Sequence, residues 1–120
     1  MREEVIRVVE TYIDAVRRND TARLPLHRDV VFAGPLRTYR GVAEFEQGIA
    51  EFVPLMKSID VIRLTADEET CAAVLDIDTI FGRVPFLEYF HVQNGKIVSI
   101  RAYYDPRAIL EGLRKQQAAG

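Results

Sequence analysis

Two aspartates in the second half of the chain alternate with apolar residues in a way that could bring two carboxyl groups together. Asp76 and Asp78 are separated by Ile77, and side chains two residues apart on a strand point to the same face. Their mutual repulsion would separate their pKa values, so that one carboxyl could act as an acid and the other as a base. The alternative interpretation is that both lie on a solvated outer face of the sheet.

Glu88 is an acidic residue within an apolar, strand-like segment. It shares its strand face with Phe86, Phe90 and Val92. If that face is buried, desolvation raises the pKa of the carboxyl, and a neutral acid can donate a hydrogen bond. If the face is wet, or if an arginine pairs with Glu88, the residue has no such role. An acidic residue on an apolar strand suggests a specific role, and we interpret Glu88 as a carboxyl that faces a pocket.

The turn after the second of these aspartates decides whether they can meet Glu88. A tight turn at Phe81-Gly82 would pair Leu75 with Glu88 and place both aspartates on the opposite face of the sheet. A change of one residue in this loop would reverse that outcome, because side chains alternate with a period of two. The sequence leaves both arrangements open.

The elements that must position these residues follow from the periodicity of apolar side chains. Helical spacing predicts helices over residues 5–16 and 42–56, with a short helix after Asp20 and a terminal helix after Pro106. Strand-like segments lie at residues 29–34, 59–64, 71–81, 84–92 and 97–104. Segregated helices and strands of this kind predict an α+β fold with an antiparallel sheet. A strongly bent sheet covered by helices makes a cone that can hold a ligand.

Composition limits the organisation and the partners of the chain. It has 120 residues, of which 48% are hydrophobic, so one domain with a substantial core is expected. Residues 1–115 are assigned to that domain and residues 116–120 to a frayed tail. The net charge is −2 and the arginines are scattered, so neither nucleic acid nor an anionic membrane is expected as a partner. No leader or membrane-spanning segment is recognisable, and a cytoplasmic location is predicted.

No cofactor and no metal ion are predicted. His27 and His91 lie far apart and do not have the spacing of metal ligands. The chain contains no glycine-rich motif for a nucleotide or a phosphate. Cys71 is the only cysteine, so no intramolecular disulfide can form, and its apolar surroundings predict a buried, inert thiol.

Four local motifs, together with the order of the elements, resemble the nuclear transport factor 2-like superfamily. The motifs are Tyr12-Ile13-Asp14-Ala15 followed by Arg18-Asn19-Asp20, Asp29-Val30-Val31-Phe32, Tyr39-Arg40-Gly41, and Asn94-Gly95-Lys96-Ile97 through Arg101-Ala102-Tyr103-Tyr104-Asp105. The resemblance covers nearly the whole chain and is closest to the SnoaL-like and limonene epoxide hydrolase-like branches and to ketosteroid isomerase. It implies a cone-shaped, curved antiparallel β-sheet wrapped by N-terminal helices around an apolar pocket. This fold hosts enzymes and binding modules alike, so it does not determine an activity.

The resemblance to ketosteroid isomerase implies roles for two residues. Tyr12 matches the tyrosine that donates a hydrogen bond to the substrate oxyanion, and Glu88 matches a protonated aspartic acid beside it. The general base of that enzyme falls at Gly34, which carries no carboxylate. Isomerase activity would therefore need another carboxylate in the pocket, and Asp76 and Asp78 are the candidates for catalytic residues.

The resemblance to epoxide hydrolases is incomplete at the residues that carry their chemistry. Those enzymes use an Asp-Arg-Asp arrangement, and the carboxylate of their last strand matches Ala102 here. Their water-positioning residues match Phe32 and Gly34, and no arginine lies at residues 75–78, where the Arg-x-Asp pair is expected. The known triad is therefore not intact.

Two functions are expected on these grounds. The first is a cofactor-independent enzyme of the isomerase, polyketide cyclase or epoxide hydrolase type, which acts on a small apolar molecule with Tyr12 and Glu88 as polar groups. The second is a non-catalytic module for ligand binding or dimerisation. The ligand is expected to contact Phe32, Gly34, Phe52, Met56, Phe86, Phe90, Ile100, Ala102 and Tyr104. A homodimer is expected through an outer patch made of Leu87, Tyr89, His91, Arg101 and Tyr103.

Overall fold

The computed structural model describes residues 1–119, which form three α-helices and six β-strands. The elements in chain order are α1 (Arg2–Arg17), η1 (Thr21–Arg23), β1 (Leu26–Ala33), β2 (Thr38–Arg40), α2 (Val42–Phe52), η2 (Val53–Leu55), β3 (Met56–Ala66), β4 (Thr70–Thr79), β5 (Gly82–Gln93), β6 (Lys96–Tyr103) and α3 (Arg107–Ala119). The predicted α+β class is confirmed, and β2 is an additional strand in a segment predicted as a loop. Within residues 1–119, no helix combines the length and the apolar character that crossing a membrane requires.

One sheet of six strands carries the fold, in the order β2-β1-β6-β5-β4-β3. Neighbouring strands are antiparallel except β1 and β6, which run parallel. The sheet is therefore mixed, whereas a purely antiparallel sheet was predicted. The parallel pair joins the first strand of the chain to the last, and local sequence patterns contain no signal for a pairing between such distant segments.

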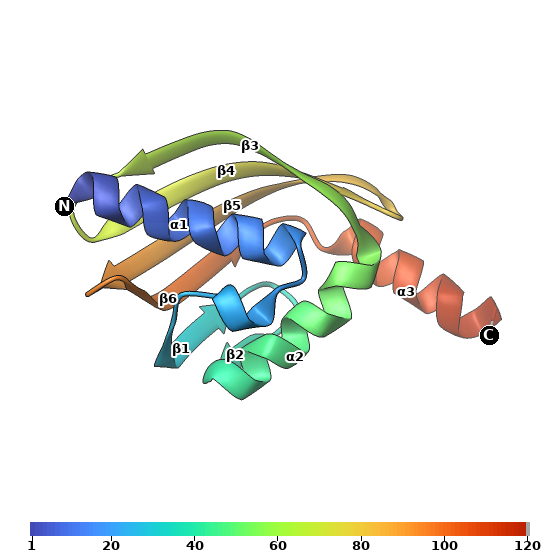
Figure 1. The fold of residues 1–120 in the computed structure, drawn as a ribbon. Helices are drawn as coiled ribbons and strands as arrows, with labels where there is room; N and C mark the ends of the chain where they lie inside the picture. Colours follow the sequence, from blue (N-terminus) through green and yellow to red (C-terminus); the bar gives the residue numbers. More distant parts are fainter. Residues whose placement is uncertain (120) are drawn as a thin grey trace.

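The sheet is strongly curved, and helices α1 and α2 lie on its concave side, with β3, β4 and β5 arching over α1 (Figure 1). Interruptions in the strand register accompany this curvature. The register of the β3–β4 pair shifts between Val61 and Arg63, and that of the β5–β6 pair shifts between His91 and Val92. Bulges bend a strand and increase its local twist, so they help the sheet to enclose the helices.

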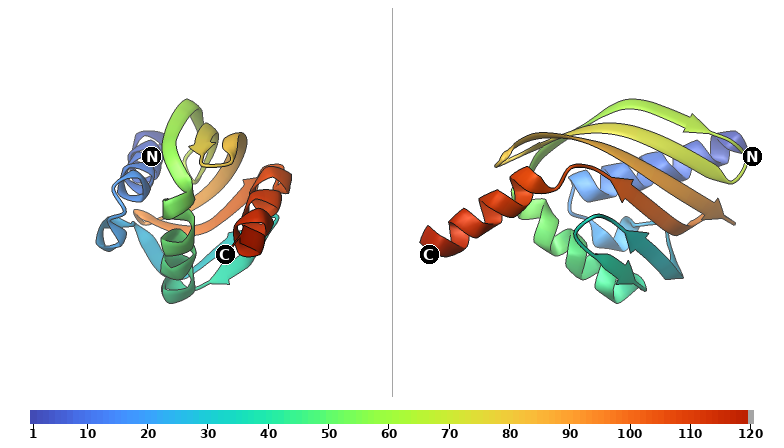
Figure 2. Two further views of the ribbon diagram at one scale, coloured as in Figure 1. Left: turned by 90° about the vertical axis from the view of Figure 1, so that its right-hand side faces the viewer. Right: turned by 180° about the vertical axis from the view of Figure 1, so that it is seen from behind.

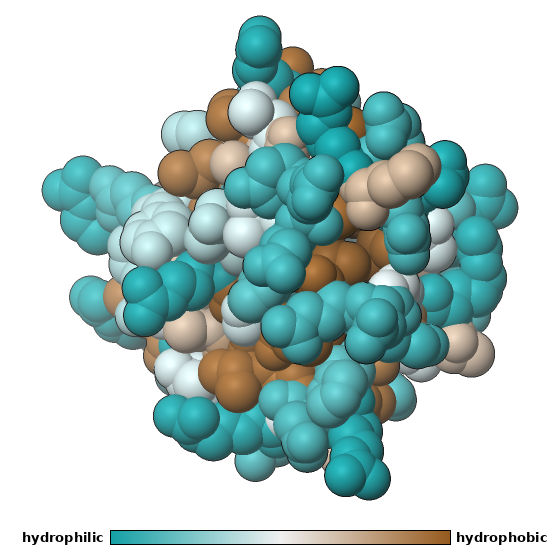
Figure 3. Space-filling view, turned by 90° about the vertical axis from the view of Figure 1, so that its left-hand side faces the viewer, coloured by the Kyte–Doolittle hydropathy of each residue, from teal (hydrophilic) through white to brown (hydrophobic). Residues whose placement is uncertain are grey.

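The space on the concave side of the sheet is filled differently at its two ends. Near the N terminus, the core contains Val5 and Val9 from α1 and Phe90 and Ile97 from the sheet, each of them buried. Hydrophilic side chains cover most of the surface at this end (Figure 3). The end nearer α3 contains a pocket instead. The position of an inward-pointing residue along its strand therefore decides whether it packs in the core or lines the pocket.

The β4–β5 hairpin determines which side chains share the concave face. Its turn consists of Ile80 and Phe81, one residue earlier than predicted, so Glu88 lies opposite Ala73 instead of Leu75. Relative to the prediction the pairing is displaced by two residues, and a displacement of two leaves every side chain on its original face. The two aspartates of β4 consequently lie on the opposite face from Glu88.

Helix α3 projects away from the rest of the molecule (Figure 2), and Ile109 is its buried residue. At its base the ring of Phe81 packs against Gly112, where an added Cβ would lie 2.2 Å from the ring. Only glycine permits this approach. Residues 116–119 continue the helix to Ala119, beyond the point where a frayed tail was predicted, and residue 120 lies outside the described residues.

Gly112→Ala is expected to destabilise the protein, although alanine favours helices. The new Cβ would lie 2.4 Å from Cγ of Phe81, and Cγ cannot move without a change of rotamer or backbone. Overpacking of this kind costs about 1–3 kcal/mol, against a gain in helix propensity of about 1 kcal/mol. Chemical unfolding measures the free energy of Gly112→Ala, Phe81→Ala and the double variant. The double variant should lose less than the sum of the single losses, and simple additivity would contradict the contact.

Candidate functional site

A pocket of about 390 Å3 lies between the concave face of the sheet and the helices. Its volume is within the roughly 300–1,000 Å3 of ordinary small-molecule sites. Most of its walls are apolar and come from Ile13, Val16, Phe32, Leu36, Phe45, Ile49, Phe52, Leu55, Ile59, Leu75, Ile77, Phe86, Ile109 and Leu113. Its polar side chains belong to Tyr12, Arg37, Tyr39, Glu51, Glu88 and Tyr104.

Tyr12 reaches the pocket from the inner stripe of α1, where Val9 precedes it and Val16 follows it at helical spacing. Its ring meets those of Phe45 and Phe90 edge to face, at centroid distances of 6.1 Å and 5.3 Å, which is a favourable geometry for aromatic pairs. Burial, and to a smaller extent the negative charge of Glu88, holds the pKa of the phenol well above its usual value. Tyr12 is therefore a stable hydrogen-bond donor within the pocket.

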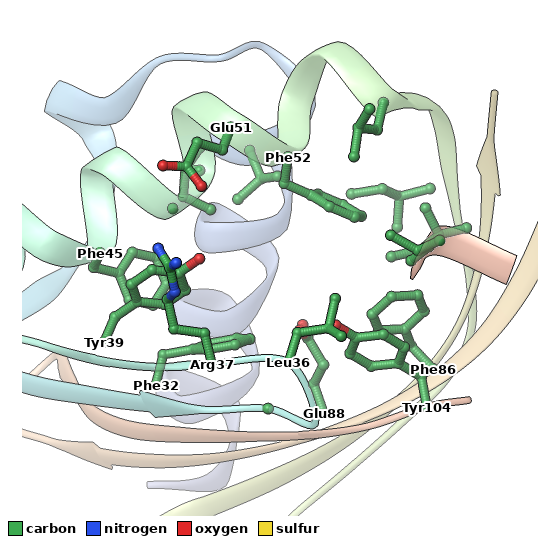
Figure 4. A pocket seen from close by; sticks show the side chains of 18 of the residues that line it. Phe32, Leu36, Arg37, Tyr39, Phe45, Glu51, Phe52, Phe86, Glu88 and Tyr104 are labelled. Carbon is green, nitrogen blue, oxygen red and sulfur yellow. The ribbon is translucent and has the colours of Figure 1, made fainter. Parts of the chain in front are cut away.

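Glu88 projects from the middle of β5 into the same pocket (Figure 4). Its neighbours on the adjacent strands are Ala73 and Ala102, two small residues that leave room above the sheet for its side chain. Glu88 is only 8% exposed, and within residues 1–119 its carboxyl has no hydrogen bond or ion pair. Desolvation raises the pKa of Glu88 from 4.5 to about 7. Near neutral pH this carboxyl can therefore both donate and accept a proton.

Two further phenols, those of Tyr104 and Tyr39, line the pocket. Tyr104, which follows β6, stacks on Phe86 at a centroid distance of 4.1 Å, and Figure 4 shows it beside Glu88. Burial, with contributions from Tyr39 and Glu88, raises the pKa of Tyr104 to about 12. The ring of Tyr39 packs against Gly48 of α2, where an added Cβ would lie 2.6 Å from the ring. A glycine inside a helix thus allows a tyrosine of β2 to line the pocket.

Asp76 and Asp78 do not belong to this site. Both point to the convex face of β4, where Arg83 approaches Asp76 at 2.9 Å and Asp78 at 4.0 Å. The same arginine donates a hydrogen bond of 2.6 Å to Asp60 on β3. The prediction that these aspartates could supply a base to the pocket is wrong, because the hairpin register places the sheet between them and Glu88.

Several residues predicted to contact a ligand do line the pocket, namely Phe32, Gly34, Phe52, Phe86 and Tyr104. Four others do not. Phe90 and Ile100 point inward as predicted but are completely buried in the core, and Met56 packs at the edge of that core. Ala102 also points inward, but it lines a separate, more open depression together with Arg101 and Tyr103. The alternation of residues along a strand predicts the face of a side chain but not its depth.

The charged residues at the mouth of the pocket were not predicted from the sequence. Arg37 belongs to the turn between β1 and β2, which is closed by a hydrogen bond of 3.1 Å from the backbone N–H of Gly34 to the carbonyl of Arg37. Glu51 lies in the last turn of α2. The helical glycine at position 48 was the one local signal that another chain segment approaches α2 closely.

The polar side chains of the pocket are suited to hydrogen bonding and proton transfer. Within residues 1–119, no three His, Cys, Asp or Glu side chains are grouped as metal ligands would be. Cys71 is completely buried, and desolvation raises the pKa of its thiol to about 11. A ligand oxygen in the pocket could accept hydrogen bonds from phenols, while Glu88 exchanges a proton with the ligand.

The stability of the protein should depend on pH through Glu88. Its pKa in the folded state, about 7, lies above the ordinary value of 4.5. Between these pH values the folded protein holds a proton that the unfolded chain has lost. The associated stability is therefore present below pH 4.5 and is lost as the pH rises through about 7.

Glu88→Gln removes this dependence, so we expect its stability relative to the wild type to rise by up to roughly 3 kcal/mol between about pH 4.5 and pH 8. Urea unfolding at several pH values measures the difference. Glu51→Gln, which changes an exposed glutamate at the mouth, is the matched control. A constant difference between Glu88→Gln and the wild type over this range would contradict the burial of the carboxyl.

Comparison with solved structures supports the fold. A protein from Kribbella flavida DSM 17836 is 19% identical with a TM-score of 0.86, over 97% of this chain and 98% of its own. A ketosteroid isomerase candidate from the same organism is 18% identical with a TM-score of 0.80, over 87% of this chain and 79% of its own. An epoxide hydrolase of the LEH-like type from M. tuberculosis is 22% identical with a TM-score of 0.74, over 98% and 95% of the two chains.

At these identities the structural likeness establishes the fold and leaves the reaction open. A search of curated proteins gave no match. The sequence itself matches the model of the SnoaL-like domain over residues 9–100, which include all the strands except the end of β6. The predicted SnoaL-like resemblance is confirmed, the fold is shared with solved structures described as NTF2-like, and the chain belongs to the family of SnoaL-like domains.

Proposed function

We propose that this protein is a cofactor-independent enzyme that transfers a proton on a small apolar molecule bearing a carbonyl or hydroxyl oxygen. The observation that carries this proposal is the carboxyl of Glu88, which is buried, has no charged partner among residues 1–119 and faces an apolar pocket. A carboxyl in such a position lowers the stability of the folded protein at neutral pH. Its presence there is understandable if it acts on a ligand.

The pocket suggests how the roles are divided. Tyr12 donates a hydrogen bond to the ligand oxygen and stabilises negative charge that develops there. Glu88 removes a proton from the ligand and returns it to another atom. One group serves as base and acid in turn because Gly34 offers no second carboxylate, the aspartates of β4 lie outside the pocket, and the carboxylate of Glu51 stands at the exposed mouth. A pKa of about 7 makes both protonation states of Glu88 available under ordinary conditions.

The structural neighbours are compatible with this assignment. A ketosteroid isomerase candidate and an LEH-like epoxide hydrolase have the same fold, so the fold accommodates enzymes of these types. We favour proton transfer over epoxide opening because Ala102 occupies the position of a required carboxylate and because Arg37 lies at the mouth, away from Glu88 (Figure 4).

A specific observation also favours a second candidate function, a binding module without catalysis. Gly34 and Ala102 have no side chain that could act in catalysis, although they occupy positions where related enzymes carry catalytic groups. Such a module would bind apolar carbonyl compounds and become more stable, by ~2.7 kcal/mol at ~100 times the dissociation constant, without exchanging protons with them.

Proton exchange distinguishes the two functions. Apolar ketones that raise the melting temperature are incubated with the protein in D2O, and NMR follows the incorporation of deuterium next to the carbonyl. We expect the rate to fall by roughly 10²–10⁴-fold in Glu88→Gln and by a smaller factor in Tyr12→Phe. Asp78→Asn, which removes a carboxylate from the outer face of the same sheet, should exchange at the wild-type rate. Binding without any exchange would refute the enzyme and support the module.

We also propose a homodimer through the convex face of the sheet. Val74, Leu87 and Tyr103 lie side by side on β4, β5 and β6 and are 39%, 40% and 52% exposed. Tyr89 adds a fourth exposed apolar side chain on β5. Apolar side chains that adjoin one another on a sheet face are typical of an interface.

Sedimentation at micromolar concentration should give twice the monomer mass for the wild type and the monomer mass for Leu87→Glu. A charge at this position would be buried without a partner in the interface. Ile62→Glu, which changes an exposed residue of β3 outside this patch, is the control and should remain dimeric. A wild-type protein that sediments as a monomer would refute the dimer.

A further inference from the structure

Two side chains of opposite charge stand at the mouth of the pocket. Arg37 comes from the turn after β1, and Glu51 comes from the last turn of α2. Both are exposed, and within residues 1–119 neither has an ion-pair partner within 4.0 Å. Figure 4 shows the guanidinium group and the carboxylate turned toward each other from the loop side and from the helix side.

A single aromatic residue connects the two elements that carry these charges. The guanidinium of Arg37 lies 6.0 Å from the centre of the Tyr39 ring, a distance at which cation–π attraction still acts. The ring of Tyr39 also packs against Gly48, three residues before Glu51 on α2. Residues three apart on a helix lie on one face. Arg37 and the helix that carries Glu51 therefore adjoin the same tyrosine, at the border between solvent and the apolar interior.

We infer that Arg37 and Glu51 determine specificity, by closing over uncharged ligands and by disfavouring ligands that carry a charge of either sign. This inference rests on the proposed binding of a small apolar molecule, and it specifies further that this molecule carries no charge. An anionic group attracted by Arg37 meets the like charge of Glu51, and a cationic group attracted by Glu51 meets Arg37. In either case attraction and repulsion largely offset each other at the mouth.

A neutral ligand has a different effect on the same two charges. Its apolar body displaces water from the pocket and lowers the effective dielectric constant between the guanidinium and the carboxylate. Attraction between opposite charges strengthens as the dielectric constant falls. The pair therefore closes more favourably over a neutral molecule than over an empty, hydrated mouth, and this slows the dissociation of that molecule.

Removing one charge should change the preference in a predictable direction. Glu51→Gln leaves Arg37 alone at the mouth and should favour anionic ligands. Arg37→Gln leaves Glu51 alone and should favour cationic ligands. Both single variants lose the closing pair, so both should release neutral ligands faster. The double variant should release neutral ligands at about the rate of the single variants, because the two side chains act as one unit.

Three probes with one aromatic skeleton test this inference: 2-acetylnaphthalene, which is neutral, 2-naphthoate, which is anionic, and 2-naphthylmethylammonium, which is cationic. Dissociation constants are measured by naphthalene fluorescence. We expect the wild type to bind the neutral probe most tightly. Glu51→Gln should improve the binding of 2-naphthoate and Arg37→Gln that of the ammonium probe, each by roughly two- to fivefold. Both single variants should weaken binding of the neutral probe by a similar factor.

Matched controls and a salt titration separate the pair from general electrostatics. Arg40→Gln on β2, three residues after Arg37, and Glu46→Gln on α2, the helix that carries Glu51, remove charges of the same sign at residues that do not line the pocket, so they should leave all three preferences unchanged. High salt should reduce the differences between the variants and the wild type.

Several results would overturn the inference. Tightest binding of 2-naphthoate by the wild type, lost in Arg37→Gln, would show an anion subsite instead. Equal preferences in the wild type and both variants would show that the mouth has no selectivity, and failure of all three probes to bind would refute this inference and the proposed function together. A protein that binds and selects the neutral probe but never exchanges protons would refute the proposed enzyme and leave the present inference intact.

Discussion

The desolvation of one carboxyl group is the constraint on which the site depends. Glu88 stands on the concave face of a curved sheet, between two alanines on the adjacent strands, and helices cover it from above. A flatter sheet or larger neighbours would push the carboxyl into water, and its pKa would return toward the ordinary value. Curvature and small flanking residues thus produce an ionisable group that titrates near neutrality inside an apolar pocket.

The polar groups of the pocket differ in their exposure to water between its bottom and its mouth. Its inner part contains Glu88 and the phenol of Tyr12, both nearly inaccessible to solvent, where electrostatic interactions are strong. Its mouth contains Arg37 and Glu51, both exposed, where the same interactions are weakened by water and salt. Polar groups at the bottom can therefore act on a reacting atom, whereas those at the mouth act on the entry and release of the whole ligand.

The glycines of this fold show how close packing positions functional side chains. Gly48 lets Tyr39 pack against α2, and Figure 4 shows the guanidinium of Arg37 turned toward Glu51 of that helix. Gly112 receives the ring of Phe81 and thereby positions α3, from which Ile109 and Leu113 reach the pocket wall. In both places the absence of a Cβ lets an aromatic ring approach a helix.

Local patterns in the sequence were sufficient for the helices, for most strands and for the inward face of β5, because hydrophobic periodicity reports directly on local conformation. Alternation along β5 also supported Glu88 as a residue that faces the pocket, whereas Tyr12 was indicated by the resemblance to ketosteroid isomerase. The parallel pairing of β1 with β6, the depth of Phe90 and Ile100, the position of Asp76 and Asp78 outside the site, and the placement of Arg37 and Glu51 at the mouth of one pocket were decided only by the tertiary structure. Each of these depends on contacts between residues distant in the chain, and periodicity along one segment contains no information about its neighbours in space.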